Sequence, residues 1–256
     1  MKTKLIIIIA LALLTGNLFA QTQIVAHRGF WDVEGSAQNS ISALQNAQNE
    51  RFYGSECDVH VTLDGIVVLN HDNDIDGLDI NEHTFAQLQN VRLQNGESIP
   101  TLENYLKQTA TGNTKLIIEI KPKNDQAQED KAVAATLDLV ERLNMGKNVE
   151  YISFSKYICQ EVKRKSPTSI VQYLSSSQQT ALTPQEIKNE GFDGLDYHFL
   201  LIGAYPNWIK ESKELGLITN VWTVNDEATM KEMLILGVDY ITTDKPLELR
   251  AILAEK

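Results

Sequence analysis

The sequence predicts an α/β fold, a (β/α)8 TIM barrel with a small insertion after the second strand. Two observations predict it. Short apolar, β-branched segments alternate with helical patterns, as in parallel strands joined by crossover helices. Eight such segments occur within 256 residues, and eight strand–helix units point to a closed barrel. This length, less a leader, suits one barrel better than two ordinary domains.

The expected strands all show β-branched or apolar runs and lie near residues 23–29, 55–61, 115–121, 149–154, 169–174, 194–198, 218–224 and 239–244. Helical patterns fill the intervals between them, for example Ser40–Glu50, Leu102–Thr109, Asp125–Asn144, Pro206–Leu215 and Asp226–Leu236. The regular alternation favours one continuous domain without a linker.

A further strand-like run, IVVLN, follows the second strand after only Asp64 and Gly65. Asp-Gly between two such runs is a strong hairpin signal. With these two residues as the loop, Asp58 lies opposite His71, so the returning arm is expected to carry His71 back beside Asp58. The whole insertion, hairpin arm and loop, is expected at about residues 60–99, and a long loop at this place is more often functional than decorative.

The first twenty residues read as a signal peptide. Lys2 and Lys4 precede an apolar run, and the small residue Ala20 precedes Gln21. The run is shorter than the roughly 20 residues that span a membrane. We therefore expect an exported chain, periplasmic or secreted, with its domain at residues 21–256 and no stable membrane anchor.

The formal net charge of -11 argues against nucleic acid as a partner. An acidic protein that acts on an anionic substrate would need a local cation. The two cysteines, Cys57 and Cys159, could pair in an oxidising compartment, but two cysteines are no disulfide framework and the sequence favours free thiols. Nothing indicates the oligomeric state.

Three carboxylates are expected at one end of the barrel, where the working residues of this fold lie. Glu56 and Asp58 lie on the second predicted strand and Glu119 on the third. A Glu-x-Asp pair alone is usually a solvated strand face, but Glu119 stands in the apolar run LIIEIKP and needs a partner. Converging carboxylates repel one another unless a cation lies between them. Oxygen ligands suit Mg²⁺ or Ca²⁺.

His27 and His71 flank this cluster in the predicted fold. Either one alone is more often a structural histidine, whereas two beside carboxylates indicate acid/base chemistry. Arg28 offers a planar donor fork for a phosphate, although it can also be an ordinary ion-pair residue. Lys121 has the same alternative, as a partner of Glu119.

Five motifs occur in order along the chain, from about Val25 to Pro246: AHRG, Glu-x-Asp-Val with its Asp-Gly turn and Val-x-x-His-Asp, IEIK, VWTVND and ITTDKP. Together they resemble the motifs of the glycerophosphodiester phosphodiesterase family. The resemblance implies a (β/α)8 barrel with an insertion after the second strand. It also implies hydrolysis of glycerophosphodiesters to glycerol 3-phosphate and an alcohol with one divalent cation, Ca²⁺ or Mg²⁺.

The same resemblance implies a role for each matching residue. The implied roles are metal ligands for Glu56, Asp58 and Glu119, acid/base catalysis for His27 and His71, phosphate contacts for Arg28 and Lys121, and an aromatic pocket wall for Trp222. One position departs from the family pattern Pro-Glu-Asn-Thr, because this chain has Gln38 where the family Glu stands. Gln38 can accept a hydrogen bond but carries no charge, which affects the support of the site and the range of substrates.

Two other functions stay open on the sequence. A two-histidine phospholipase, acting on lysophospholipids or phosphoinositides, would use the same chemistry. Phe85 is the single aromatic residue between Asn73 and Ile99, and this favours a soluble small-molecule head group. A barrel that binds glycerophosphodiesters without cleaving them is the second alternative. The sequence leaves open which histidine is the acid and whether a cyclic phosphate forms.

Overall fold

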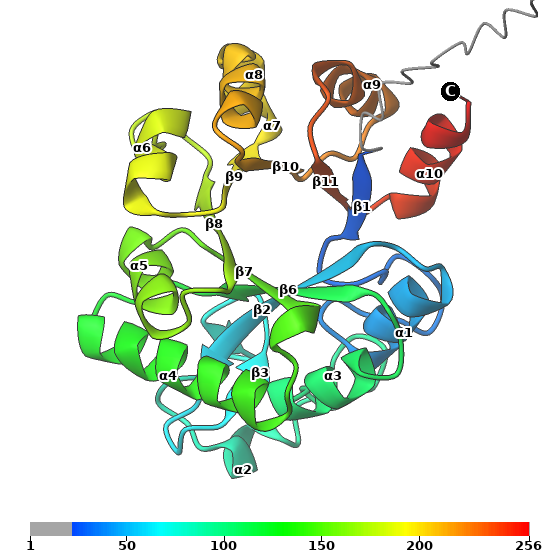
Figure 1. The fold of residues 1–256 in the computed structure, drawn as a ribbon. Coiled ribbons are helices and arrows are strands. Elements are labelled where there is room, and N and C mark those ends of the chain that lie inside the picture. Colours follow the sequence, from blue (N-terminus) through cyan, green and yellow to red (C-terminus); the bar gives the residue numbers. More distant parts are fainter. Residues whose placement is uncertain (1–21, 256) are drawn as a thin grey trace, which may run out of the picture.

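The computed structural model describes residues 22–255, so the predicted leader and its cleavage point lie outside the described residues. Eight parallel strands form a closed barrel, because the first strand pairs with both the second and the last (Figure 1). The predicted fold class is confirmed. The barrel strands are β1 (Gln23–Ala26), β2 (Gly54–Val61), β6 (Lys115–Ile120), β7 (Val149–Ser153), β8 (Ile170–Ser175), β9 (Gly194–His198), β10 (Ile218–Trp222) and β11 (Tyr240–Thr243).

Helices surround the barrel on the outside (Figure 1). They are α1 (Ile41–Asn49), α3 (Leu102–Thr109), α4 (Gln126–Arg142), α5 (Lys156–Lys165), α6 (Pro184–Glu190), α7 (Phe199–Ala204), α8 (Asn207–Glu214), α9 (Glu227–Leu236) and α10 (Pro246–Ala254). Short polar side chains start several of them. Ser40, for example, accepts a hydrogen bond from the first turn of α1, and Asp226 does the same for α9. Gly191 and Gly237 end α6 and α9 in the left-handed conformation.

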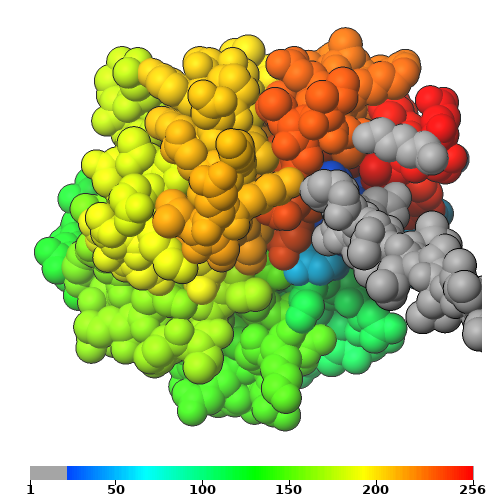
Figure 2. Space-filling view, turned by 45° about the horizontal axis from the view of Figure 1, so that its top comes forward, coloured from blue at the N-terminus to red at the C-terminus, as the bar shows by residue number. Residues whose placement is uncertain are grey.

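The apolar side chains form two concentric layers. The larger layer lies between the strands and the helices. A smaller one fills the interior of the barrel with Val25, Ile117, Ile152, Leu174 and Tyr240. Strands buried on both faces explain the nearly continuous apolar runs of the sequence. The colours in Figure 2 follow one another around the molecule from green through yellow and orange to red, as expected when successive units are neighbours.

The insertion after β2 contains β3 (Val67–Leu69), β4 (Asp74–Ile75), β5 (Leu78–Asp79) and α2 (Phe85–Leu88). β3 pairs antiparallel with β2, so the expected hairpin is present. A small apolar cluster around Val68, Ile80, Leu88 and Ile99 holds the insertion together, and Phe85 packs against it. The single aromatic residue of this segment is thus used in packing.

The predicted register of this hairpin is wrong by one residue. Val59 pairs with Leu69, so Asn70 and not His71 lies opposite Asp58, and the Asn70 amide donates to the Asp58 carbonyl at 3.2 Å. The loop has three residues, because Thr62 pairs with Ile66 and Gly65 adopts the left-handed conformation at φ +87°. Asp-Gly fits this loop as well as the two-residue loop. His71 lies beyond the end of β3 and still lines the site.

Two further findings concern the described residues. None of the helices within 22–255 has the length and apolarity that a membrane span requires. Cys57 and Cys159 are buried free thiols.

Candidate active site at the carboxyl ends of the strands

The three predicted carboxylates converge at the carboxyl ends of β2 and β6. Asp58 and Glu119 are register partners on these neighbouring strands, and Glu56 precedes Asp58 by one period of the pleat. One ligand atom from each side chain lies within 4.8 Å of the others. All three side chains are buried, with Asp58 at 1% exposure. The structure therefore brings together the whole predicted ligand set.

The electrostatics of this cluster are unfavourable without a cation. Burial, reinforced by repulsion from Asp58 and Glu119, raises the pKa of Glu56. Burial and the Asp58 carboxylate raise the pKa of Glu119 to about 7. For Asp58, burial acts in the same direction, but the Lys121 ammonium and the other donors outweigh it and lower the pKa. Because the oxygens are clustered and two of the carboxyls resist ionisation, the donor set fits a hard divalent cation.

Two cations and an amide surround Asp58. Lys121 Nζ lies 3.0 Å from Asp58 Oδ1 and 2.9 Å from Glu119 Oε1. Arg28 Nε lies 3.6 Å from Asp58 Oδ2. Asn39 makes two hydrogen bonds with Asp58. Its Nδ2 donates to Asp58 Oδ2 at 2.9 Å, and its Oδ1 accepts from the Asp58 amide at 3.1 Å. These neighbours fix the position of the Asp58 carboxylate and favour its ionised form.

Arg28 occupies a strained backbone position, with φ +54°. Its amide donates to Glu56 Oε2 at 2.7 Å, and its Nη1 donates to Gln38 Oε1 at 2.7 Å. The residue that departs from the family pattern therefore still braces the guanidinium. Because Gln38 is neutral, it leaves the positive charge of Arg28 uncompensated on that side.

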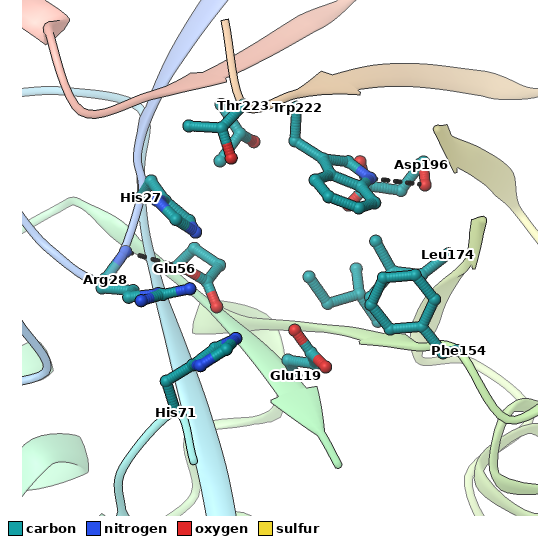
Figure 3. Close-up of a pocket in the computed structure, with 12 residues that line it drawn as sticks. His27, Arg28, Glu56, His71, Glu119, Phe154, Leu174, Asp196, Trp222 and Thr223 are labelled. Carbon is teal, nitrogen blue, oxygen red and sulfur yellow. Dashed lines mark hydrogen bonds between the residues drawn. The ribbon is translucent and has the colours of Figure 1, made fainter. Parts of the chain in front are cut away.

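The two histidines are held in the same way. His27 Nδ1 lies 2.8 Å from Asp244 Oδ1, and His71 Nδ1 lies 2.7 Å from Asp72 Oδ1. A carboxylate only accepts, so each Nδ1 carries the hydrogen and each Nε2 is left to exchange a proton with a ligand. Burial, then the Lys121 ammonium, lowers the pKa of His71. Both rings line the same cavity (Figure 3).

The supports of the two histidines differ in depth. Asp72 is 76% exposed, whereas Asp244 is 18% exposed. Asp244 also accepts from Trp31 Nε1 at 3.1 Å and from Asn225 Nδ2 at 2.7 Å. The sequence reasoning missed these supporting residues and Asn39. A signal for Asp244 exists, since it directly follows β11, the strand that barrel closure places beside β1.

The cavity itself has a volume of about 140 Å³. His27, Arg28 and His71 lie on one side of it, and Trp222, Phe154 and Leu174 lie on the other (Figure 3). The predicted wall residue Trp222 donates from Nε1 to the Asp196 carbonyl at 2.9 Å, and its ring stands perpendicular to that of Phe154. The cavity thus joins a charged half to an apolar half.

The predicted residues Asp58 and Lys121 lie one layer behind the cavity lining. They contact Arg28 and Glu119, which do line it. A basic side chain and two imidazoles around a buried carboxylate cluster fit one class of protein, a barrel that hydrolyses phosphate esters.

The comparisons with known proteins narrow this class. The model of the glycerophosphoryl diester phosphodiesterase family matches residues 27–248. The chain therefore belongs to the glycerophosphoryl diester phosphodiesterase family, as the sequence motifs predict. It is an enzyme, a phosphoric diester hydrolase.

Individual relatives agree with this assignment. A glycerophosphodiester phosphodiesterase of Caldanaerobacter subterraneus subsp. tengcongensis is 24% identical over 238 residues, which cover 88% of this chain and 95% of that protein. The crystal structure of a glycerophosphodiester phosphodiesterase from Parabacteroides distasonis has 44% identity and a TM-score of 0.89, covering 92% of this chain and 98% of that chain. A phosphodiesterase of Oleispira antarctica, solved with the product sn-glycerol-3-phosphate, shares the fold at 22% identity, with a TM-score of 0.80 and coverage of 92% and 98%.

Proposed function

We propose that this enzyme hydrolyses glycerophosphodiesters to glycerol 3-phosphate and an alcohol with one divalent cation, Ca²⁺ or Mg²⁺, and with His27 and His71 as the acid/base pair. The observation that carries the proposal is the shared geometry of the histidines, each with Nδ1 on a carboxylate and both beside one buried carboxylate cluster. The sn-glycerol-3-phosphate bound to the Oleispira antarctica phosphodiesterase supports the product.

Glu56, Asp58 and Glu119 would hold the cation, which when bound supplies neutralising charge at the phosphate oxygens. The guanidinium of Arg28 reaches the cavity directly and would pair with a phosphate oxygen. Lys121 would add positive charge from behind the lining, through its contacts with two of the carboxylates.

One imidazole, neutral at Nε2, takes the proton of the attacking hydroxyl, and the other, protonated at both nitrogens, gives its Nε2 proton to the departing alcohol oxygen. Attack by water gives glycerol 3-phosphate directly. Attack by the glycerol hydroxyl gives a cyclic phosphate, which a water molecule then opens with the two histidines in exchanged roles. The aspartates keep both rings in the tautomer that this exchange needs. Trp222 and Phe154 would shield the apolar side of the reacting ester from water.

The test is a panel of glycerophosphodiesters assayed for glycerol 3-phosphate, with EDTA and with Ca²⁺ or Mg²⁺ restored, on wild type, His27→Ala and His71→Ala. We expect chelation to abolish release, one of the two metals to restore it, and each alanine variant to lose at least about 100-fold in kcat while remaining folded. Full activity in EDTA would overturn the metal role. Near-normal turnover of either variant would overturn its acid/base role.

Export of the chain is part of the same proposal, on the strength of the leader-like first twenty residues. Expression of the full chain with fractionation of the cells tests it. Mature enzyme that begins near Gln21 in the periplasm or medium is the expected result, and an uncleaved chain in the cytoplasm is the contrary one.

A further inference from the structure

His60 is a buried histidine of β2 to which the proposed function gives no role. Its side chain has 0% exposure and lies two residues beyond Asp58. The ring stands between two groups of other segments. Lys123 Nζ lies 2.7 Å from its Nδ1, and the main-chain carbonyl of His71 lies 3.4 Å from its Nε2.

These two neighbours select one form of the ring. The ammonium of Lys123 only donates hydrogen bonds, so Nδ1 of His60 must accept. The carbonyl of His71 only accepts, so Nε2 must carry the ring hydrogen and donate it. The three groups form a continuous chain of hydrogen bonds from Lys123, in the segment after β6, through His60 on β2 to the backbone of His71.

The backbone of His71 has particular need of such a contact. His71 lies two residues beyond Leu69, the last residue of β3, in the irregular part of the insertion. Its ring is 42% exposed, and the partner of that ring, Asp72, is more exposed still. His27, in contrast, is bonded to the barrel through its own amide, which donates to the Thr243 carbonyl at 3.0 Å.

Lys123 extends the contact to the next part of the insertion, because its Nζ also lies 3.4 Å from Asn73 Oδ1. The two neighbours of Asp72 are thus both connected to the buried imidazole of His60, His71 directly through its carbonyl and Asn73 through Lys123.

We propose that His60 is a positioning residue that holds His71 through the main-chain carbonyl, with Lys123 selecting the tautomer that makes this contact. The inference rests on the proposed function, since it requires His71 to act in the reaction. It adds a role for a residue that is neither among the residues lining the cavity nor one of the three carboxylates.

Two substitutions of His60 separate its hydrogen bond to Lys123 from its hydrogen bond to the His71 carbonyl. In His60→Gln, the amide Nε2 can occupy the place of the ring Nε2 and donate to His71. In His60→Asn, the shorter amide can meet Lys123 at the place of Nδ1 but cannot reach the carbonyl. Both remove the ring, but His60→Asn removes one methylene more, so a merely structural role predicts a lower free energy of unfolding for His60→Asn without a selective loss of kcat in the folded enzyme.

We expect kcat of His60→Asn to fall about 10- to 100-fold with KM changed less than about threefold, since small misplacements of a reacting group act on turnover. His60→Gln should retain kcat within about threefold of wild type. The assay uses the glycerophosphodiester that wild type cleaves fastest, at saturating metal. His83→Gln, a change elsewhere in the insertion, is the control and should leave kcat unchanged.

Equal kcat values for His60→Asn and His60→Gln, whether normal or reduced, would overturn the proposal. His71→Ala in the same series separates it from the proposed function. An active His71→Ala enzyme contradicts the proposed function, whereas an inactive one beside a normal His60→Asn enzyme contradicts only the positioning role.

A measurement on the wild-type enzyme keeps the proposal testable should the core variants fail to fold. ¹⁵N-imidazole NMR reads the tautomer of each histidine, and the His60 signal is the one that changes in Lys123→Met. The expected pattern is a hydrogen on Nε2 in wild type and a partial shift to Nδ1 in Lys123→Met. A hydrogen on Nδ1 in wild type contradicts the proposal.

Discussion

At the scale of single residues, Asp244 carries the most consequence for the site. Three donors converge on its carboxylate, from His27, Trp31 and Asn225, and two of these contacts reach the same oxygen. A carboxylate fixed in this way keeps the His27 ring in one orientation and one tautomer, and it stabilises the imidazolium when the ring takes a proton.

Asp244→Asn should therefore lower kcat/KM by about 100-fold, because an amide in this place no longer favours the required tautomer or the charged ring. The matched control is Asp72→Asn, which changes the exposed support of the other histidine and should cost less. Steady-state kinetics of both variants decide the matter. The expectation fails if Asp72→Asn is the more damaging of the two, or if Asp244→Asn turns over normally.

The same residue predicts a pH dependence of stability. Burial acts to raise the pKa of Asp244, but hydrogen bonds, led by that from His27, outweigh it and lower the pKa. Between this lowered value and about 3.9, the value in an unfolded chain, the folded state binds fewer protons than the unfolded state, so the contribution of Asp244 to stability disappears as the pH falls.

The free-energy difference between wild type and Asp244→Asn, measured by urea unfolding, should accordingly shrink as the pH is lowered from about 5 to about 3. A difference that stays constant over this range would show that the carboxylate is not ionised preferentially in the folded state.

At the scale of elements, the loop of the β2–β3 hairpin sets the register of the insertion. Gly65 is left-handed with φ +87°, a conformation that costs an L-residue about 1–2 kcal/mol. Gly65→Ala should thus lower the free energy of unfolding by about 1 kcal/mol. Gly146→Ala is the control, because Gly146 has no positive φ and no atom within 4 Å of an added Cβ. Equal effects in urea unfolding of the two variants would speak against this account.

The elements also show what sequence patterns can predict. The eight strands and the five named helices follow from local apolar periodicity and capping, since these act over a few residues. The five helices are those expected at Ser40–Glu50, Leu102–Thr109, Asp125–Asn144, Pro206–Leu215 and Asp226–Leu236. The hairpin register did not follow, because Asp64-Gly65 suits a two-residue and a three-residue loop alike. The choice depends on contacts of Asp64 with Thr62 and with the distant Phe85 amide, which the sequence alone does not reveal.

For the site, the carboxylates Glu56, Asp58 and Glu119 were predictable because strand period and barrel geometry bring them to one end. The residues that position the carboxylates and the histidines were harder to predict. Asn39 and Asp244 have ordinary identities for loops, and their partners lie 19 and 217 residues away in the chain. Only the three-dimensional closure of the barrel turns them into parts of the site.

At the scale of the whole molecule, the carboxylate cluster links stability to the cation. Glu56→Gln removes a carboxyl whose ionisation is opposed by burial and by the two neighbouring carboxylates, and it retains an acceptor for the Arg28 amide. In EDTA we expect its Tm to exceed that of wild type by about 2–4 °C, for about 1 kcal/mol of relieved repulsion.

The same variant should lose most of the metal response. Wild type should gain about 5–10 °C at a metal concentration 100 times Kd. Glu150→Gln, which changes a buried carboxyl outside the cluster, should keep that gain. Differential scanning calorimetry with and without Ca²⁺ or Mg²⁺ measures all three proteins, and an undiminished metal response in Glu56→Gln contradicts the assignment of Glu56 as a ligand.

The order of the site along the chain also bears on how the enzyme folds. β2 and β6 supply the carboxylates from the first half of the chain, whereas the acceptor for His27 Nδ1 arrives 217 residues later, directly after β11. Pairings this remote in sequence are slow to form. During folding, the cluster can therefore assemble well before His27 is oriented, and recovery of catalytic turnover after refolding reports the docking of the last strand.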